Sequence, residues 1–563
     1  MRLGPRARAD ARPGDLVTVE IGRGGARVVA VHGRVGSARA AMAALLASEG
    51  LGRPFSEAAL AEAEAAVDAS LEVDPERRDL TGQRVITIDP EGAKDHDDAV
   101  AVVAEGEAIR LWVHIADVAR YVAQGGPIDR EALRRGCSVY VPGTVDPMLP
   151  ERLSSDICSL RPGVDRKVVT VEMLVDARGT VLERRFSRAL VHSRRRLTYP
   201  EVDAALAGGG DFADPALEAD LRLAHELAER LRRRRLRRGA LEIATTEPAF
   251  TFSGAHVAGV RMEGQTPAHS LVEECMIAAN EAVARHMLAR SRSTVYRYHP
   301  DPQERPVELL YERLEALKVR VPPLPDGPLT PTDCAAAVRR AAQAVSRHVA
   351  RSGHGRAVVT LVLQALGQAV YSADLVGHSG LASAAYLHFT SPIRRYPDLV
   401  AHRALLDTLG LGEPGPDAAT CAEAAERSSL AERAAAALER RADRIVLAHL
   451  LVDRLRDGDG HPAFDGEATG IGDGGLFAAF GPDGPEPYDG YLPARRIGED
   501  WWRPDPLGVA LVADGSGRRI AIGDPVAVRV VDVDRLRGRV DLEPADAPAA
   551  RPARRAGRAR GRR

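Results

Sequence analysis

Short apolar stretches separated by glycine, proline and charged residues mark the start of the chain. Residues 14–35, GDLVTVEIGRGGARVVAVHGRV, read as two β-strands joined by a glycine-rich turn. Residues 38–70 are rich in alanine and predict helices, with Pro54 and Ser56 marking a break and a new helix start. We therefore expect a small hairpin followed by helices.

The middle of the chain, residues 80–410, alternates strand-like and helical segments, which is typical of an α+β domain. Residues 322–331 are rich in proline and predict a loop. After residues 412–417, a stretch rich in alanine, arginine and glutamate predicts a helix over about 418–456. The apolar positions expected to pack this helix on the core are Leu430, Ala434, Leu438 and Ile445.

Short strands return in residues 463–545, where FDGEATGIGDGGLFAAF, GYLPARRIG and GDPVAVRVVDVDRLRGRVDLEP follow one another. Their spacing is typical of a small β-barrel of the OB type. The last thirteen residues hold seven arginines and no acidic residue. This composition predicts a disordered tail, either simply solvated or in loose contact with RNA.

Composition narrows the class of protein without naming a function. A chain of 563 residues is long enough for several domains, and its formal net charge of −2 does not by itself indicate nucleic-acid binding. The five cysteines are an odd number without zinc-binding spacing, which indicates reduced thiols in a cytoplasmic protein. No apolar run is long enough to span a membrane, so no membrane association is expected.

The strongest chemical signal is a cluster of aspartates in ITIDPEGAKDHDDAV. An apolar strand, residues 85–88, leads into Asp89, and three more carboxylates follow a turn, at Asp95, Asp97 and Asp98. Carboxylates this close repel one another and favour a cation among them. Oxygen ligands of this kind suit Mg²⁺ or Mn²⁺, although an acidic loop is also typical of a plain solvated turn.

A second segment, HFTSPIRRYPDLVAHR (residues 388–403), supplies the opposite charge. Arg394 and Arg395 can bind phosphate oxygens with two hydrogen bonds each, and the neighbouring Ser391 hydroxyl adds a neutral donor. Apolar residues flank the segment, so it reads as part of a packed site more than as surface filler. Carboxylates and arginines together are typical of phosphodiester chemistry.

Several long motifs now occur in one order along the chain. They are the aspartate segment, WVHIADVARYV (112–122), SVYVPGTVDPMLPERLSSDICSL (138–160), AHSLVEECMIAANEAVA (268–284) and GHSGLASAAYLHFTSPIRRYPDLVAHR (377–403). Together they resemble the catalytic domain, called the RNB domain, of the ribonuclease II / ribonuclease R family of 3′-to-5′ exoribonucleases. The resemblance implies hydrolysis of single-stranded RNA to nucleoside 5′-monophosphates.

The resemblance also implies roles at the reacting phosphate. Asp89, Asp95 and Asp98 would hold a catalytic Mg²⁺, and Asp97 would help to bind a second metal and the attacking water. Arg394 would stabilise the charge that develops on phosphorus. All these residues are present, so nothing indicates a decayed site.

Other positions match those that hold the RNA in the family. Tyr140 and Phe250 would stack on bases, although Phe252, two residues further, competes with Phe250 for this role. Tyr199 and Glu281 match positions that read the ribose 2′-hydroxyl. The remaining RNA-binding candidates are Ser391, Arg394 and Glu439, of which Glu439 reads equally well as a salt-bridged helix residue.

The fold implied is an α+β catalytic RNB domain followed by an S1-like β-barrel of the OB type, with a truncated OB-like segment at the N-terminus. The expected divisions are 1–40 (OB or cold-shock-like remnant), 41–79 (helical linker), 80–410 (RNB domain), 411–462 (helical extension), 463–546 (S1-like domain) and 547–563 (arginine-rich tail).

Three functions compete at this point. The first is an active exoribonuclease, expected as a cytoplasmic monomer in RNA decay or processing, with loose association with RNA-decay factors. The second is a non-catalytic RNA-binding regulator on the same fold, against which the intact aspartates and Arg394 count. The third is a nuclease for structured or transfer-RNA precursors.

Overall fold

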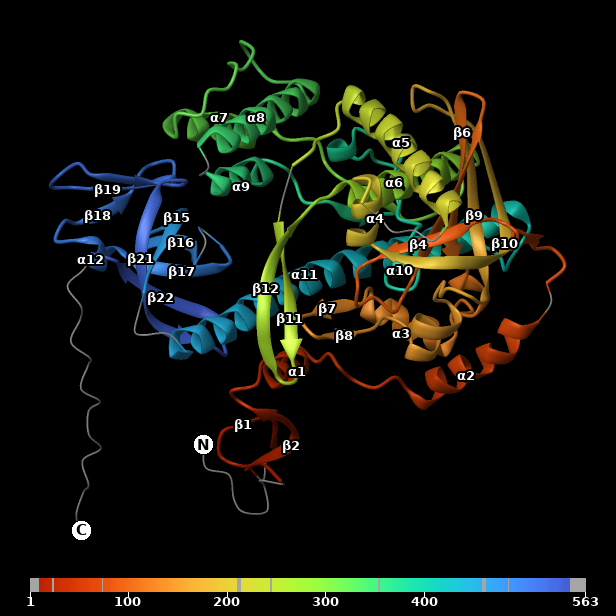
Figure 1. Ribbon diagram of the computed structural model, residues 1–563, viewed down its shortest axis with the longest axis horizontal. Helices are drawn as coiled ribbons and strands as arrows, with labels where there is room; N and C mark the ends of the chain where they lie inside the picture. Colours follow the sequence, from red (N-terminus) through yellow and green to blue (C-terminus); the bar gives the residue numbers. More distant parts are fainter. Residues whose placement is uncertain are drawn as a thin grey trace.

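A computed structural model shows how these segments assemble (Figure 1). It describes residues 10–22, 25–72, 74–209, 214–243, 246–352, 355–457, 462–482, 484 and 486–546. The expected arginine-rich tail, residues 547–563, lies outside the described residues.

The N-terminal part forms the expected hairpin and helices. Strands β1 (Asp15–Gly22) and β2 (Gly25–Arg34) pair antiparallel. Helix α1 (Ala38–Ser48) follows, and α2 (Glu57–Leu71) begins after Ser56, whose side chain accepts a hydrogen bond from the Ala59 N–H. The Pro54–Ser56 break is therefore confirmed, because Ser56 caps the second helix.

A six-stranded sheet forms the core of the α+β part of the molecule, in the order β3-β10-β4-β5-β6-β9. The long strand β10 pairs with β9 through its first part and, in parallel, with β4 through its last part, so the sheet closes on itself. The strands are β3 (Arg78–Asp79), β4 (Val85–Asp89), β5 (Asp98–Glu105), β6 (Ala108–Ala116), β9 (Asp165–Val175) and β10 (Val181–Thr198).

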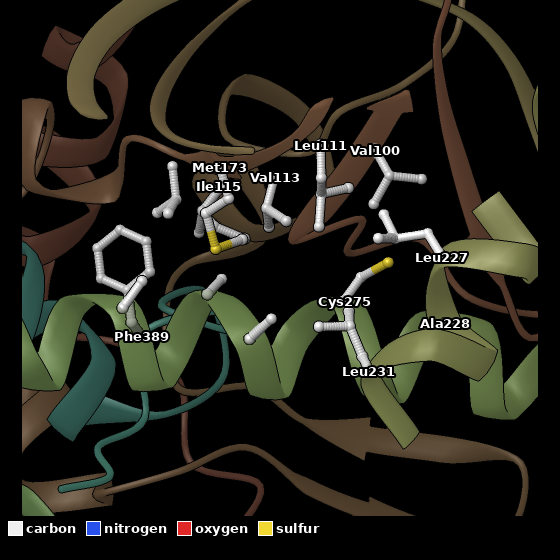
Figure 2. Packing of buried hydrophobic residues seen from close by; sticks show 14 of the residues in the cluster. Val100, Leu111, Val113, Ile115, Met173, Leu227, Ala228, Leu231, Cys275 and Phe389 are labelled. Atoms are coloured by element: carbon white, nitrogen blue, oxygen red, sulfur yellow. The ribbon is translucent and has the colours of Figure 1, made fainter. Parts of the chain in front are cut away.

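Helices cover both faces of this sheet. One face packs on α5 (Pro215–Arg238) and α6 (Pro267–Ala289) through a continuous apolar core, in which Leu111, Met173 and Leu227 meet (Figure 2). The other face packs on α2 and on helices that come later in the chain: α3 (Pro127–Arg135), α10 (Tyr396–Leu409) and α11 (Ala418–Asp457).

Smaller elements complete the central α+β body. The two-stranded ribbons are β7 (Val139–Val141) with β8 (Thr144–Asp146), β11 (Thr246–Ser253) with β12 (His256–Gly264), and β13 (Tyr296–Tyr298) with β14 (Val370–Ser372). The remaining helices are α4 (Tyr199–Leu206), α7 (Glu304–Ala316), α8 (Pro331–Ser352) and α9 (Arg356–Gln364). The proline-rich stretch before α8 is a loop, as expected.

Helix α11 is present, but only two of the four residues expected on its buried face are buried. Leu438 and Ile445 are buried, whereas Leu430 is 54% exposed and Ala434 is exposed as well. The buried positions in this stretch fall at Ala435, Leu438 and Ala442. The buried side of α11 changes along the helix, because successive parts of it pack against different apolar clusters.

Residues 463–544 form a closed five-stranded barrel, in the order β15-β16-β17-β22-β21. Its strands are β15 (Ala463–Gly472), β16 (Gly475–Gly481), β17 (Tyr488–Pro493), β21 (Pro525–Asp534) and β22 (Arg539–Pro544). Between β17 and β21 the chain forms α12 (Ala494–Ile497) and a separate small sheet of β18 (Trp502–Pro504), β19 (Ala510–Ala513) and β20 (Arg519–Ala521). The barrel lies at the opposite end of the molecule from the central sheet (Figure 1).

A buried glutamate ties the barrel to the helical layer beside it. The Glu467 carboxylate, on β15, accepts hydrogen bonds from the N–H groups of Gly355 (2.9 Å) and Ala357 (3.1 Å) at the start of α9. A carboxylate at a helix N-terminus satisfies donors that have no partner within the helix. The two parts are thus joined by a polar contact that water cannot replace.

Replacing Glu467 by glutamine is expected to lower the free energy of unfolding by about 1–3 kcal/mol, because the amide NH2 that replaces one carboxylate oxygen would face one of the two buried N–H donors. Urea unfolding of the full chain measures this. The matched control is Glu499→Gln, at an exposed barrel residue, which should change stability by less than about 0.5 kcal/mol. Equal effects at both positions would contradict the role given to Glu467.

Among the described residues, no helix is both long and apolar enough to cross a bilayer.

Candidate active site

A large cavity, of about 1500 Å³, opens where the end of β4, the β7–β8 ribbon, α6 and the segment before α10 meet. Small-molecule pockets measure about 300–1,000 Å³, so this cavity has room for a polymer end. Polar and aromatic residues from these elements line it, including Asp89, Asp95, Asp97, Asp98, Tyr140, Tyr199, Glu273, Asn280, Ser391 and Arg394.

The four aspartates all reach this cavity because a strand ends and another begins beside it. Asp89 is the last residue of β4 and Asp98 is the first residue of β5, while Asp95 and Asp97 lie in the loop between. The Asp97 Oδ1 accepts a hydrogen bond from the Ile393 N–H at 2.8 Å, which ties the loop to the arginine segment about 300 residues later. The sequence-predicted juxtaposition of acids and arginines is therefore present.

The electrostatic setting of the carboxylates is unfavourable for their charged form. Burial raises the pKa of Asp98 to about 7, and the nearby Asp89 carboxylate adds to this effect. Burial also raises the pKa of Asp97 well above its ordinary value, while the guanidinium of Arg394 opposes the rise. A cation among these groups would restore the charged forms.

The hydrogen bonding of the aspartate oxygen atoms shows whether these residues suit a metal ion. The Oδ2 atoms of Asp89 and Asp97 are buried and lack a hydrogen-bond partner. Each has one basic group near it, His96 Nδ1 at 2.9 Å from Asp89 and Arg394 Nε at 3.4 Å from Asp97. Buried carboxylate oxygens left without donors suit a divalent cation such as Mg²⁺.

The carboxylates do not, however, form a finished coordination shell. In the part of the chain that the structure describes, no three His, Cys, Asp or Glu side chains stand in metal-binding arrangement. Mg²⁺ usually takes only one or two carboxylates and fills its shell with water and substrate phosphate. The donor set therefore fits Mg²⁺ together with a phosphate, and metal binding stays a proposal.

Arg394 reaches the cavity from a rigid support. Its Nη2 donates to the Ser391 Oγ at 3.1 Å, and the Ser391 N–H donates to Asp398 at 2.8 Å. The neighbouring Arg395 forms two hydrogen bonds with the fully buried Asp398 carboxylate, at 2.8 and 3.0 Å. Arg395 is therefore neutralised, whereas the half-exposed Arg394 can meet an incoming phosphate.

Tyr140 lies at the mouth of the acidic cluster. Its hydroxyl donates to the Asp95 Oδ2 at 2.6 Å, and the residue as a whole is 37% exposed. Its backbone N–H donates to the Glu439 Oε1 at 2.9 Å. Glu439 on α11 thus holds the tyrosine backbone in place, and it forms no salt bridge within the described residues.

Tyr199 lies on the other side of the aspartates. It is the first residue of α4, directly after the end of β10, whose Thr198 pairs with Asp89 of β4. Its ring stacks on His269 with 3.8 Å between centroids. Burial raises the pKa of the Tyr199 hydroxyl to about 12, so at neutral pH this group is a hydrogen-bond donor in the cavity wall.

Phe250 is not brought to the cavity. It packs partly buried between the β11–β12 ribbon, α11 and the barrel, while Phe252 packs against Gly143 and below the Arg39 guanidinium. The register shift beside Thr251 leaves its extra residue, Ala258, on β12, so Phe250 and Phe252 keep the same face of β11 and pack against the same apolar cluster. Phe250 and Phe252 do not line the described cavity, and the choice between them as the stacking partner of Tyr140 stays a prediction.

Glu281 is also displaced from its expected role. It accepts hydrogen bonds from Arg238 and Arg285 in a different, smaller cavity. The preceding residue, Asn280, and Glu273, two turns earlier on α6, line the large cavity instead. Successive helix residues point about 100° apart, so a one-residue difference changes which cavity a side chain meets.

An aromatic wall of the cavity was missed by sequence reasoning. His378, Tyr386 and His388 all line it, and the Tyr386 ring lies edge-on to both histidines. Burial lowers the pKa of His378 to about 3, so this wall is neutral. The motif that carries it, GHSGLASAAYLHF, was noted only as a whole.

Comparison with known proteins now identifies the class. The family model described as the RNB domain matches residues 77–410, which is more than half of the chain. The chain therefore belongs to the RNB-domain family, and the resemblance seen in the sequence is confirmed.

Its curated relatives include ribonucleases R. Ribonuclease R of Escherichia coli K12 is 34% identical over 478 residues, which cover 83% of this chain and 57% of that protein. Ribonuclease R of Aquifex aeolicus is 36% identical over 482 residues, which cover 83% of this chain and 64% of that protein. The chain thus spans somewhat more than half the length of these relatives.

Solved structures show the same fold. Mycoplasma genitalium RNase R in complex with ribose-methylated single-stranded RNA matches with a TM-score of 0.85 at 24% identity, covering 96% of this chain and 85% of that one. Yeast Ssd1, described as a pseudonuclease, matches with a TM-score of 0.63 at 15% identity, covering 88% and 62%. The fold thus occurs both in ribonucleases and in a protein without that activity.

Proposed function

We propose that this protein is a metal-dependent 3′-to-5′ exoribonuclease that hydrolyses single-stranded RNA to nucleoside 5′-monophosphates. The observation that carries the proposal is the convergence of four aspartates and Arg394 on one large cavity. The 34% identity to ribonucleases R supports the substrate class.

Asp89, Asp95 and Asp98 would hold Mg²⁺, with Mn²⁺ as the alternative. Asp97 would help to bind a second metal ion and the attacking water. Bound there, the metal would supply Lewis-acid stabilisation of the phosphate and a more acidic water. The chain's own groups orient this centre, because the Ile393 N–H fixes Asp97 and the Tyr140 hydroxyl fixes Asp95.

Arg394 would bind the scissile phosphate and stabilise its developing negative charge, since Asp97 and Ser391 hold the guanidinium at the cavity wall before substrate arrives. Tyr199 would donate to the ribose of the terminal nucleotide, and a contact with the 2′-hydroxyl distinguishes RNA from DNA. Ser391 acts by holding Arg394, and Glu439 acts by holding Tyr140.

The non-catalytic alternative has a precedent in the fold of Ssd1. The presence of Asp89, Asp95, Asp97, Asp98 and Arg394 in one cavity favours an active enzyme. The deciding experiment is a time course on 5′-labelled RNA with a 3′ overhang, with Mg²⁺ and with EDTA. Stepwise shortening that stops in EDTA supports the proposal, and intact RNA in Mg²⁺ contradicts it.

Tyr140→Ala is expected to weaken binding of a short single-stranded RNA by about 1–3 kcal/mol, because a base loses its stacking partner. Tyr140→Phe keeps the ring and removes only the hydrogen bond to Asp95, so it should bind RNA nearly as well as the parent. Fluorescence anisotropy in EDTA measures both variants without hydrolysis. Equal losses in the two would assign the effect to the hydroxyl instead of the ring.

The C-terminal barrel is proposed as an S1-like RNA-binding domain. Phe477 on β16 is 49% exposed and lies 5.2 Å from the Tyr491 ring on β17, which gives an aromatic platform for bases. The proposed extent of this domain is 463–546, after the RNB domain (80–410) and its helical extension (411–462). The preceding parts, an OB-like remnant (1–40) and a linker (41–79), remain predictions.

The double variant Phe477→Ala/Tyr491→Ala is expected to weaken binding of a long single-stranded RNA by at least about fivefold, since each stacked base is worth about 1–3 kcal/mol. Anisotropy with a long and a short RNA measures it, and the short RNA should be little affected. Trp501→Ala, at a 74% exposed aromatic residue just before β18, is the matched control. A larger loss from the control would contradict this platform.

The remaining proposals concern the cell. We propose a cytoplasmic enzyme that works as a monomer in RNA decay or processing, with loose association with other RNA-decay factors.

A further inference from the structure

A second cavity lies behind the catalytic one, on the far side of helix α6. It is small, about 30 Å³, and is bounded by β10, α5 and α6. Five arginines and two glutamates line it: Arg184, Arg234, Arg235, Arg238, Arg285, Glu274 and Glu281. Its apolar floor includes Leu231 of α5, which packs beside α6 in Figure 2.

Three of the arginines are held by the two glutamates. Arg235 donates to the Glu274 Oε1, and both side chains are almost completely buried. Arg238 and Arg285 both donate to Glu281. These ion pairs hold the cavity walls in place. Both carboxylates of the cavity are already neutralised by arginines.

Two arginines remain without an acidic partner in the described part of the chain. Arg184 on β10 and Arg234 on α5 line the cavity and form none of the ion pairs found among the described residues. The cavity thus carries three more positive than negative groups. Like charges gathered in one place repel each other, and an anion bound between them removes that cost.

The positive field is felt by a neighbouring histidine. Burial, followed by the charges of Arg290 and Arg184, lowers the pKa of His286, one turn after Ala282 on α6, to about 4. His286 therefore stays neutral at physiological pH and adds no charge of its own. The excess of positive charge is carried by guanidinium groups, which remain charged at any physiological pH.

The size of the cavity limits the ligand. One buried water needs roughly 10–15 Å³ measured in this way. A space of about 30 Å³ accepts a few oxygen atoms but excludes a base or a ribose. Arginine guanidinium groups match the oxygens of phosphate with paired hydrogen bonds.

We propose that this cavity is a binding site for a phosphomonoester group, supplied by inorganic phosphate or by the 5′-phosphate of a nucleoside monophosphate whose nucleoside stays outside. Arg184 and Arg234 are its principal ligands, and Arg238 borders it. This inference does not rest on the proposed nuclease activity, since it concerns binding alone.

The site is connected to the catalytic cavity by a short path. Arg238 also donates to the Leu381 carbonyl oxygen at 3.0 Å, and Leu381 lines the catalytic cavity. Ile277 of α6 lines both cavities. A phosphate that binds Arg238 would therefore affect the position of Leu381 in the wall of the catalytic cavity.

Calorimetric titration of the full chain in EDTA tests the site with three probes: inorganic phosphate, adenosine 5′-monophosphate and adenosine. Phosphate and the monophosphate are expected to bind, and adenosine is not. Equal affinity of the first two identifies the phosphate group as sufficient, whereas tighter binding of the monophosphate shows that the nucleoside adds contacts. Binding of adenosine alone would overturn the proposal.

The double variant Arg184→Gln/Arg234→Gln is expected to weaken phosphate binding by at least about tenfold. The matched control is Arg185→Gln/Arg233→Gln, which removes the same charge from neighbouring exposed positions outside the cavity. The control should change affinity by less than about twofold, because only distant, screened charge is lost. If the double variant does not fold, the single variant Arg184→Gln, at an exposed position of β10, is tested in its place.

Two results would overturn the site. The first is an equal loss in the pocket variant and in the control, which would show a diffuse effect of surface charge. The second is unchanged binding in the pocket variant together with loss in Arg394→Ala, which would place the phosphate in the catalytic cavity.

Discussion

Replacing Asp97 by asparagine is expected to reduce turnover by roughly a thousandfold or more, which corresponds to about 4 kcal/mol of transition-state stabilisation. Asp97 is the most enclosed of the four carboxylates, held by the Ile393 N–H and close to Arg394. Asparagine keeps an oxygen that can accept from Ile393, so the fold should survive. Single-turnover hydrolysis of a 5′-labelled RNA in Mg²⁺ measures the loss.

RNA binding by this variant should stay within about twofold of the parent, because the aromatic and phosphate contacts lie outside the substituted group. Asp326→Asn, in the exposed loop before α8, removes the same charge away from the cavity and should keep full activity. Turnover close to that of the parent in Asp97→Asn would contradict the catalytic assignment of the cluster.

Arg394→Ala is expected to reduce turnover at least about a hundredfold, on the scale of losing one preorganised donor to a developing charge. The melting temperature should hardly change, since the side chain is 44% exposed. Steady-state kinetics and a thermal melt of the same preparation measure the two quantities together.

Arg305→Ala provides the control for this substitution. Arg305 lies on α7, is 69% exposed and pairs with Glu308 and Glu312. It should retain parental turnover. If Arg394→Ala instead loses stability while its specific activity per folded molecule is unchanged, then Arg394 is a structural residue.

The convergence of the four aspartates on one cavity could be predicted from sequence because local signals agree there. The apolar strand β4 places Asp89 at its end. The short loop to β5 keeps Asp95, Asp97 and Asp98 at the same end of the sheet. The partner segment with Arg394 was recognisable as a long motif, although its contact with Asp97 is a long-range fact that only the fold supplies.

The errors have physical reasons of another kind. Phe250 packs between the β11–β12 ribbon, α11 and the barrel, and the alternation of residue types along a strand does not say which element covers each face. Glu281 was displaced because two adjacent positions of α6 face two different cavities, and helical periodicity alone does not say which lies where. Leu430 of α11 is exposed because the partners of this helix change along its length.

Helix α11 has a mechanical consequence for substrate handling. Glu439 holds the Tyr140 backbone, and three turns later Leu451 is buried in the core of the barrel. The two residues are twelve positions apart, which corresponds to about 18 Å of continuous helix. The two ends are therefore rigidly coupled, so that a tilt of the barrel shifts Tyr140 at the mouth of the large cavity.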